Sequence, residues 1–175
     1  MKKVSLFLIM GFAATFAMAQ NTATVTQTGD NHKADVTQKG GMLNSATILQ
    51  NGGNGNRIGA PVAGDVGVDA GVDLSLAKGL VQEGNSNVAN ITQTGNLNII
   101  QQFRPNGPVP IFNSVYQKGN SNNLEMKQIG DKNVIGQAPH EYNGLDQTQG
   151  SGNDAKILQQ GNLNKLTYFY QLNDG

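Results

Sequence analysis

The feature of this chain that most constrains its fold is a repeat of eleven residues. One clear copy runs from Asn87 to Gly95 with the pattern N-x-A-x-I-x-Q-x-G, and the next copy begins at Asn98. About thirteen such units, several of them degenerate, run from Asn21 to Tyr170. A period this short predicts that each unit contributes one small element of secondary structure, stacked on its neighbours.

Alternation within the unit indicates a β-strand. Every second side chain of a strand lies on the same face, and in the unit those positions hold Asn, a small or aliphatic residue, an aliphatic residue and Gln. The positions between them are mostly Thr, Asn, Asp, Lys and Ser, which suit water. The Gly after Gln permits a tight turn. We therefore expect an all-β fold, a β-solenoid of about six to seven flattened two-strand coils that form two stacked parallel sheets.

The inward positions are the candidate functional residues. One unit buries too little apolar surface to offset the entropy of ordering its backbone, so its stability has to come from stacking. Inward amides are costly unless they are bonded, and identical amides that repeat along a stack can bond to one another. We expect the stacking ladder, which is also the candidate polymerisation surface, to comprise Asn21, Val25, Gln27, Val36, Gln38, Asn44, Ile48, Gln50, Gln82, Asn87, Ile91, Gln93, Asn98, Val115, Gln117, Asn122, Gln128, Asn133, Asn153, Ile157, Gln159 and Asn164. The expected turn glycines are Gly29, Gly40, Gly52, Gly84, Gly95, Gly119, Gly130 and Gly161.

Both ends of this stack are expected to be open. A good unit begins at Asn21, and the last unit, Asn164 to Tyr170, is not followed by a charged cap. The terminal strands of a solenoid carry unpaired N–H and C=O groups. Head-to-tail addition of further copies does not close on itself and therefore gives filaments. We predict a structural subunit that polymerises by edge templating: each added chain folds on an exposed coil and exposes a new one.

The first residues are typical of a secretory signal peptide. Two lysines precede an apolar run, Val4 to Phe16, and a small-x-small motif ends at Ala19. The apolar run is too short to span a membrane as a helix. The expected organisation is a signal peptide over 1–19 and a repeat domain over 20–175, with loop insertions near 59–75, 105–110 and 138–144.

Composition argues against several kinds of site. The chain has no cysteine, so it forms no disulfide, thiol nucleophile or Cys-based zinc site. Its formal net charge is zero, which argues against a nucleic-acid partner. No G-x-S-x-G or HExxH motif occurs. We expect no catalytic residue, cofactor, metal or small-molecule substrate, although Asp65, Asp69 and Asp73 leave a calcium site open beside the favoured solvated loop.

Other interpretations remain open beside the fibre subunit. A monomeric adhesin or ligand-binding module would use the flat outer face of the solenoid, and a β-helix enzyme would need a carboxylate-lined cleft for which no recurring carboxylate pair is present. A disordered polar chain would not keep aliphatic residues at alternate positions. His32 stands in an Asn position and is expected to make an inward hydrogen bond. Gatekeeping against premature aggregation is expected of Asp30, Asp35, Asp131 and Asp154.

The spacing of Gln, Gly and Asn resembles the curlin repeat of curli fibre subunits. The pattern Q-x-G-x-x-N-x5-Q-x-G-x-x-N occurs from Gln82 to Asn98 and again from Gln117 to Asn133, and the resemblance covers most of residues 21–170. It implies a secreted, non-enzymatic subunit of extracellular amyloid fibres for adhesion and biofilm, either a major subunit or a minor, nucleating one. Implied partners are further copies of the chain, other curlin subunits including a nucleator, the outer-membrane secretion pore, and its accessory factors.

Overall fold

The computed structural model describes residues 20–59, 77–100, 112–136, 145–147, 151–166 and 169–171. Within these residues the chain forms three five-stranded sheets, in which neighbouring strands pair in parallel. No helix among these residues is long and apolar enough to cross a membrane. The predicted signal peptide lies outside them.

Each sheet gathers strands that are far apart in the sequence. Sheet A contains β1 (Thr22–Asp30), β4 (Ser45–Asn54), β7 (Val88–Thr94), β10 (Asn123–Ile129) and β13 (Asp154–Gln160). Sheet B contains β2 (Lys33–Ala34), β5 (Arg57–Ile58), β8 (Ile99–Ile100), β11 (Val134–Ile135) and β14 (Lys165–Leu166). Sheet C contains β3 (Val36–Lys39), β6 (Ala77–Glu83), β9 (Phe112–Lys118), β12 (Leu145–Gln147) and β15 (Phe169–Gln171).

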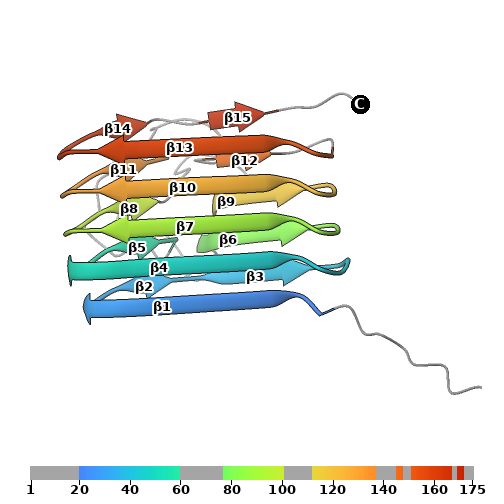
Figure 1. The fold of residues 1–175 in the computed structure, drawn as a ribbon, viewed down its shortest axis with the longest axis horizontal. Helices are drawn as coiled ribbons and strands as arrows, with labels where there is room; N and C mark the ends of the chain where they lie inside the picture. The colour runs from blue at the N-terminus through green and yellow to red at the C-terminus, as the bar shows by residue number, and fades with distance from the viewer. Residues whose placement is uncertain are drawn as a thin grey trace, which may run out of the picture.

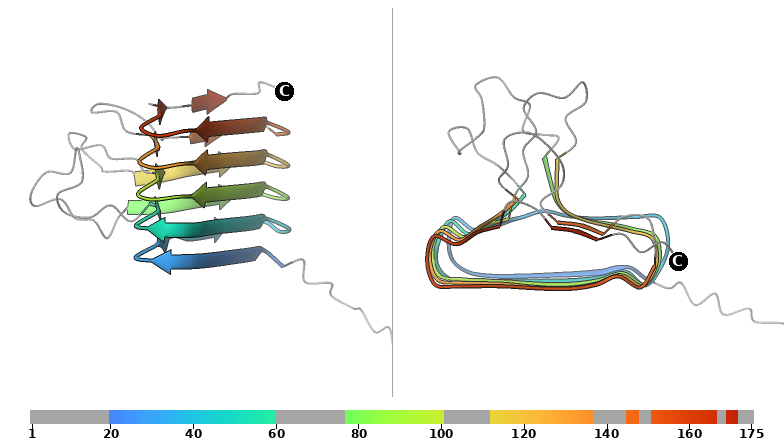
Figure 2. Two further views of the ribbon diagram at one scale, coloured as in Figure 1. Left: turned by 60° about the vertical axis from the view of Figure 1, so that its left-hand side comes forward. Right: turned by 90° about the horizontal axis from the view of Figure 1, so that it is seen from above.

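One strand from each sheet makes one coil, and the coils stack as a flat solenoid. We number the coils from the N-terminus: coil 1 is β1–β3, coil 2 is β4–β6, coil 3 is β7–β9, coil 4 is β10–β12 and coil 5 is β13–β15. Figure 1 shows β1 at one end of the stack and β14 and β15 at the other. Seen along the stack, the coils superpose, with sheet A on one long side and sheets B and C on the other (Figure 2). The all-β solenoid expected from the repeat is confirmed.

The number of coils and sheets differs from the expectation. The described residues contain five coils rather than six to seven, and the second face consists of two sheets rather than one. Two of the degenerate units, one around Ile58 and one around Leu80, are the two halves of one side of coil 2. Because two sequence units share one side of a single coil, the described residues form fewer coils than the number of units suggests.

The interruptions occur at one place in the coil, the seam between sheets B and C. Residues 59–76, 101–111 and 136–144 connect the two sheets in coils 2, 3 and 4. In coil 1 the single residue Asp35 makes this connection, and in coil 5 only residues 167–168 do. The expected insertions fall within the three long connections, almost entirely outside the described residues, as do Asp65, Asp69 and Asp73. The three middle coils therefore differ from the two terminal coils at the seam.

Strict register aligns equivalent residues along the stack. In sheet A, Ile48 pairs with Ile91, Ile91 with Met126, and Met126 with Ile157. Alternation directs these side chains inward, where β-branched and aliphatic residues pack well on a pleated surface. The buried apolar core is Ala46, Ile48, Ala89, Ile91, Leu124, Met126, Ala155 and Ile157 from sheet A, with Ile58, Ile100, Ile135, Leu80 and Val115 from the facing sheets.

Candidate functional site: amide ladders and the two ends of the stack

Inward glutamines of sheet A form a continuous ladder through all five described coils. The Nε2 atom of each donates to the Oε1 atom of the glutamine in the following coil, at 2.7 to 2.8 Å. Gln50, Gln93 and Gln128 are fully buried. Because a buried amide is costly without partners, each glutamine depends on the coils on either side of it. The ladder members are Gln27, Gln50, Gln93, Gln128 and Gln159.

A second glutamine ladder runs along sheet C and bonds successive coils near their turns. Gln38 donates to Gln82 at 2.9 Å, and Gln82 donates to Gln117 at 2.8 Å. The Nε2 atom of Gln82 also donates to the backbone carbonyls of Ser45 and Asn87, each at 3.1 Å. The same amides that link successive coils therefore also join the two long sides of the solenoid.

Inward asparagines form two columns at the turns. Before sheet A, the backbone N–H of each donates to the Oδ1 atom of the asparagine in the preceding coil, at 3.0 to 3.1 Å. Before sheet B, the corresponding bonds between asparagines are 2.9 to 3.1 Å long. The first column is Asn21, Asn44, Asn87, Asn122 and Asn153, and the second is His32, Asn56, Asn98, Asn133 and Asn164. Asn56 belongs to this column although it was not among the expected ladder residues.

His32 takes the asparagine position at the N-terminal end of the second column. Its Nδ1 atom accepts the backbone N–H of Asn56 at 3.2 Å, and its Nε2 atom lies 3.1 Å from the carbonyl oxygen of Thr28. The neutral tautomer with hydrogen on Nε2 satisfies both partners. His32 therefore makes the kind of hydrogen bond expected from its place in the repeat.

A third ladder, missed in the sequence, runs along the outside of the turn between sheets A and B. The backbone N–H of Asn54 donates to the Oδ1 atom of Asn96 at 3.0 Å, that of Asn96 to Asp131 at 2.7 Å, and that of Asp131 to Asn162 at 2.8 Å. The signal was present, since Asn or Asp follows the turn glycine in each of these coils. The backbone N–H of Asn96, and then its side-chain amide, lower the pKa of Asp131 by hydrogen bonding.

All the expected turn glycines have positive φ, from 55° at Gly40 to 124° at Gly29. At Gly95 a methyl group would collide with the backbone carbonyl of Gly130 in the next coil, and at Gly130 it would collide with that of Gly161. Glycine is therefore required at these positions for two reasons, the backbone conformation and the close approach of the coil above.

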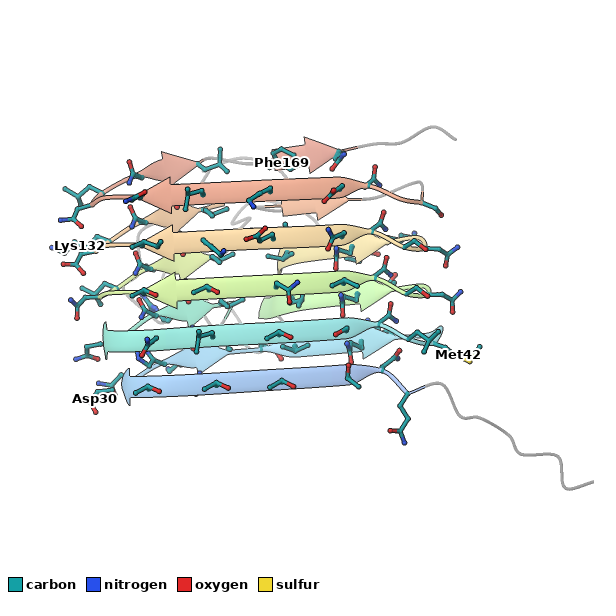
Figure 3. The ribbon with its side chains drawn as sticks, in the orientation of Figure 1. Asp30, Met42, Lys132 and Phe169 are labelled. Atoms are coloured by element: carbon teal, nitrogen blue, oxygen red, sulfur yellow. The ribbon has the colours of Figure 1, made fainter. Side chains whose placement is uncertain are left out.

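The two ends of the stack are incompletely covered. Every residue of β1 is exposed, and Val25 is 44% exposed, whereas Ile91 at the same position in coil 3 is 1% exposed. At the other end, Leu166 and Phe169 are only partly buried against the core, as are Ala34 and Val36 of coil 1. Figure 3 shows Asp30 and Phe169 at these opposite ends. Of the expected ladder residues, Val25 and Gln27 of β1 are therefore the exposed ones among the described residues.

The outer face of sheet A carries one ion-pair cluster between coils 4 and 5. The carboxylate of Glu125 lies 2.7 Å from the ammonium of Lys127 and 2.8 Å from that of Lys156. Hydrogen bonds from Lys127 and then Lys156 lower the pKa of Glu125 from 4.5 to about 2, and the bond to Glu125 raises the pKa of Lys156. In the described part of the chain, no group of three or more His, Asp and Glu side chains is placed to hold a metal ion.

Comparison with known proteins gives one match. Residues 19–40 match the family model described as the curlin associated repeat, a segment that contains all three strands of coil 1. No curated protein and no solved structure gives a significant match to the chain. Coil 1 is therefore similar to the curlin associated repeat, and the inward glutamine ladder that begins in coil 1 continues in sheet A through all five described coils.

Proposed function

We propose that this chain is a structural subunit of extracellular, curli-like amyloid fibres, which polymerises by adding copies to the ends of the solenoid. The observation that carries the proposal is the state of β1: nine residues with the repeat's inward pattern that form the edge of sheet A and are all exposed. An exposed parallel edge presents unpaired N–H and C=O groups to another strand. A further coil placed there bonds as the coils inside the chain do.

The inward ladders make such growth self-propagating. In the middle of the stack, each glutamine amide is bonded to the glutamines of the coils before and after it, as Gln93 is to Gln50 and Gln128. Stacks of identical amides and parallel strands are the arrangement found in amyloid. A chain that folds on an exposed end completes the last ladder and offers the same groups again, so the ladder residues are the proposed polymerisation surface.

The cellular setting follows the same proposal. We infer that residues 1–19 are a signal peptide, that 20–175 form the fibre-forming domain, and that the fibre lies on the bacterial surface in adhesion and biofilm. The proposed partners are further copies of the chain, a nucleating curlin subunit, and the outer-membrane secretion pore with its accessory factors. The proposed role is structural rather than enzymatic. Mass determination of the exported chain tests the cleavage after Ala19.

Fibre formation by the purified mature chain tests the proposal. We expect amyloid-dye fluorescence and a meridional reflection at about 4.7 Å. Val25→Lys places a charge on the inward side of the exposed edge and is expected to slow growth at least about tenfold. Thr26→Lys, on the outward side of the same strand, is the matched control and should change the rate by less than about threefold. A chain that stays monomeric for days contradicts the fibre proposal and supports the monomeric adhesin.

A further inference from the structure

Apart from Val25 of β1, the large apolar side chains that are exposed in the described residues gather at or beside the two narrow edges of the flat solenoid. At the turn from sheet A to sheet B, coils 3 to 5 carry a set that we call the A–B patch: Leu97, Ile129, Leu158 and Leu163. At the turn from sheet C into sheet A, between coils 1 and 2, lie Met42 and Leu43, which we call the C–A pair. Figure 3 shows Lys132, from the first kind of turn, and Met42 at opposite sides of the molecule.

Three of these leucines hold a backbone conformation that suits other residues better. Leu43, Leu97 and Leu163 have φ of 62°, 54° and 60°, in the left-handed region. A Cβ atom in that region crowds the following carbonyl oxygen, so glycine, asparagine and aspartate are the residues that usually adopt it. Leu163 is 73% exposed and Leu43 is 59% exposed, so neither gains much burial in return. Strained positions of this kind are concentrated at functional contacts.

The other turns show that this position does not need leucine. The equivalent residues also have positive φ, and they are small, polar or charged. In the turn from sheet A to sheet B they are Asn31, Gly55 and Lys132, and in the turn into sheet A they are Ser86, Ser121 and Gly152. Ile129 is likewise the apolar member of an outward column whose other members are Thr28, Asn51, Thr94 and Gln160. The fold therefore does not account for the apolar residues, which points to a contact outside the chain.

The two edges cannot cover each other within one chain. The turn into sheet A precedes each of its strands and the turn to sheet B follows it, so the edges lie at opposite ends of sheet A (Figure 2). Its shortest strands have seven residues, which at about 3.3 Å per residue keeps the edges roughly 23 Å apart. A second copy beside the first, facing the same way, brings unlike edges together.

Resting on the proposed function, we propose a lateral interface between filaments, in which the C–A pair of a copy in one filament packs on the A–B patch of a copy in the next. Both surfaces are aliphatic, and the flexible side chain of Met42 adapts to an irregular surface. Lys132 lies between Leu97 and Leu163 in the patch and is exposed. Two A–B patches face to face would bring their lysines together, and such like charges repel. The C–A pair brings no charge, so unlike edges are favoured.

The size of the contact fits filaments rather than single chains. A few side chains at an edge bury far less than the roughly 1,000 Å² that a specific interface needs, so we expect free chains not to pair through it. In a filament the same edge recurs once per subunit, and many weak contacts act together because the first holds the others at a high effective concentration. Each paired filament keeps one edge free, so further filaments add side by side and form a flat ribbon.

Variants of each edge test the contact with residues that the repeat already uses at the same positions. Leu97→Asn with Ile129→Thr removes the middle of the A–B patch, and Leu43→Ser removes half of the C–A pair. None of these residues belongs to β1 or β13, the outermost strands of sheet A. We expect each variant to elongate at an unchanged rate and to give bundles with at least about fivefold fewer filaments in electron micrographs. A variant that bundles like the unaltered chain overturns the interface.

Leu49→Thr is the matched control for the loss of an aliphatic surface residue. Leu49 lies in the middle of the outer face of sheet A, where its neighbours in the column are Thr26 and Thr92. Its bundles should be as wide as those of the unaltered chain, and narrower ones would show that any loss of apolar surface acts alike. Urea denaturation adds a second readout, because Leu97→Asn relieves an unfavourable conformation and should not lower the midpoint. A lower midpoint would give Leu97 a role within the chain and overturn its role between filaments.

Mixing the two kinds of edge variant decides whether unlike edges meet. Filaments with an altered A–B patch keep the C–A pair, and filaments of Leu43→Ser keep the patch. Neither should bundle alone, whereas a mixture labelled in two colours should give two-colour doublets at least about fivefold more often than one-colour doublets, and no wider bundles. One-colour doublets in excess would show that like edges meet and would overturn the proposal.

The unaltered chain separates this interface from the fibre proposal on which it rests. If the chain forms filaments that stay single at high filament concentration, the lateral interface is wrong and the fibre proposal stands. If the chain forms no filaments, the fibre proposal itself fails, and the lateral interface fails with it.

Discussion

Strands β1 and β7 carry the same alternation of residues but lie in opposite environments. Ala23, Val25 and Gln27 of β1 are exposed, whereas Ala89, Ile91 and Gln93 of β7 are buried. β7 has a parallel neighbour on either side, β4 and β10, and β1 has only β4 among the described strands. The difference shows that in this fold burial is decided by position in the stack, and that a repeat unit gains its stability from the units next to it.

The largest difference is expected for the aliphatic residue at the centre of each strand. Ile91→Ala should lower the free energy of unfolding of the monomer by about 2–5 kcal/mol, because it leaves a cavity between packed coils. Val25→Ala should lower it by less than about 1 kcal/mol, since Val25 is already 44% exposed. Urea denaturation of freshly prepared monomer measures both. Equal losses would show that β1 is packed as tightly as β7.

A smaller difference is expected for the glutamines. Gln93→Met keeps the volume of the side chain but leaves Nε2 of Gln50 and Oε1 of Gln128 without their ladder partners, which should lower the free energy of unfolding by about 1–3 kcal/mol. Gln27→Met removes one bond at the end of the ladder and should have about half that effect or less. The same denaturation experiment compares them. A Gln27→Met loss as large as that of Gln93→Met would contradict the dependence on stacking.

The smallest effect should come from the ion pairs of Glu125, on the surface between coils 4 and 5. Its pKa is lowered in the folded chain, so its contribution to stability is present above pH 4.5 and is lost as the pH falls toward about 2. Glu125→Gln should remove that part of the pH dependence and leave β1 unaffected. Thermal unfolding of both proteins between pH 2 and 5 measures how much stability the ion pairs contribute. Added salt should make this contribution smaller, because it screens the charges. An identical pH dependence in the two proteins would show that the pair contributes nothing measurable.

Much of the fold followed from the sequence because the pattern is local. The alternation from Asn87 to Gly95 is enough to predict an inward face and a turn, and the structure forms β7 and its turn there. The stacked parallel sheets follow from repeating that pattern. The pattern does not say how many neighbouring strands each strand has. It therefore predicts that Val25 and Ile91 are buried alike, whereas Val25 is exposed and Ile91 is buried in the structure.

The remaining differences have physical reasons too. The residues between Ile58 and Ala77 separate two half-strands, and nothing in a single sequence says that two incomplete units complete one side of a coil. The outer ladder of Asn96, Asp131 and Asn162 was missed because turn polarity is usually explained by solvent exposure. In the structure, Asp131 bonds the backbone of the preceding coil as well as facing water. Its proposed gatekeeping and its hydrogen bonding are compatible.

The placement of the three long connections has a consequence for the proposed fibre. They lie between sheets B and C in coils 2, 3 and 4, whereas one residue makes this connection in coil 1 and two residues make it in coil 5. If copies join through coils 5 and 1, three coils with a long connection at the seam alternate with two coils whose connections have one and two residues. That pattern repeats about every 24 Å, five strand spacings, in addition to the spacing between strands. The fibre would then have an axial periodicity set by the length of the subunit.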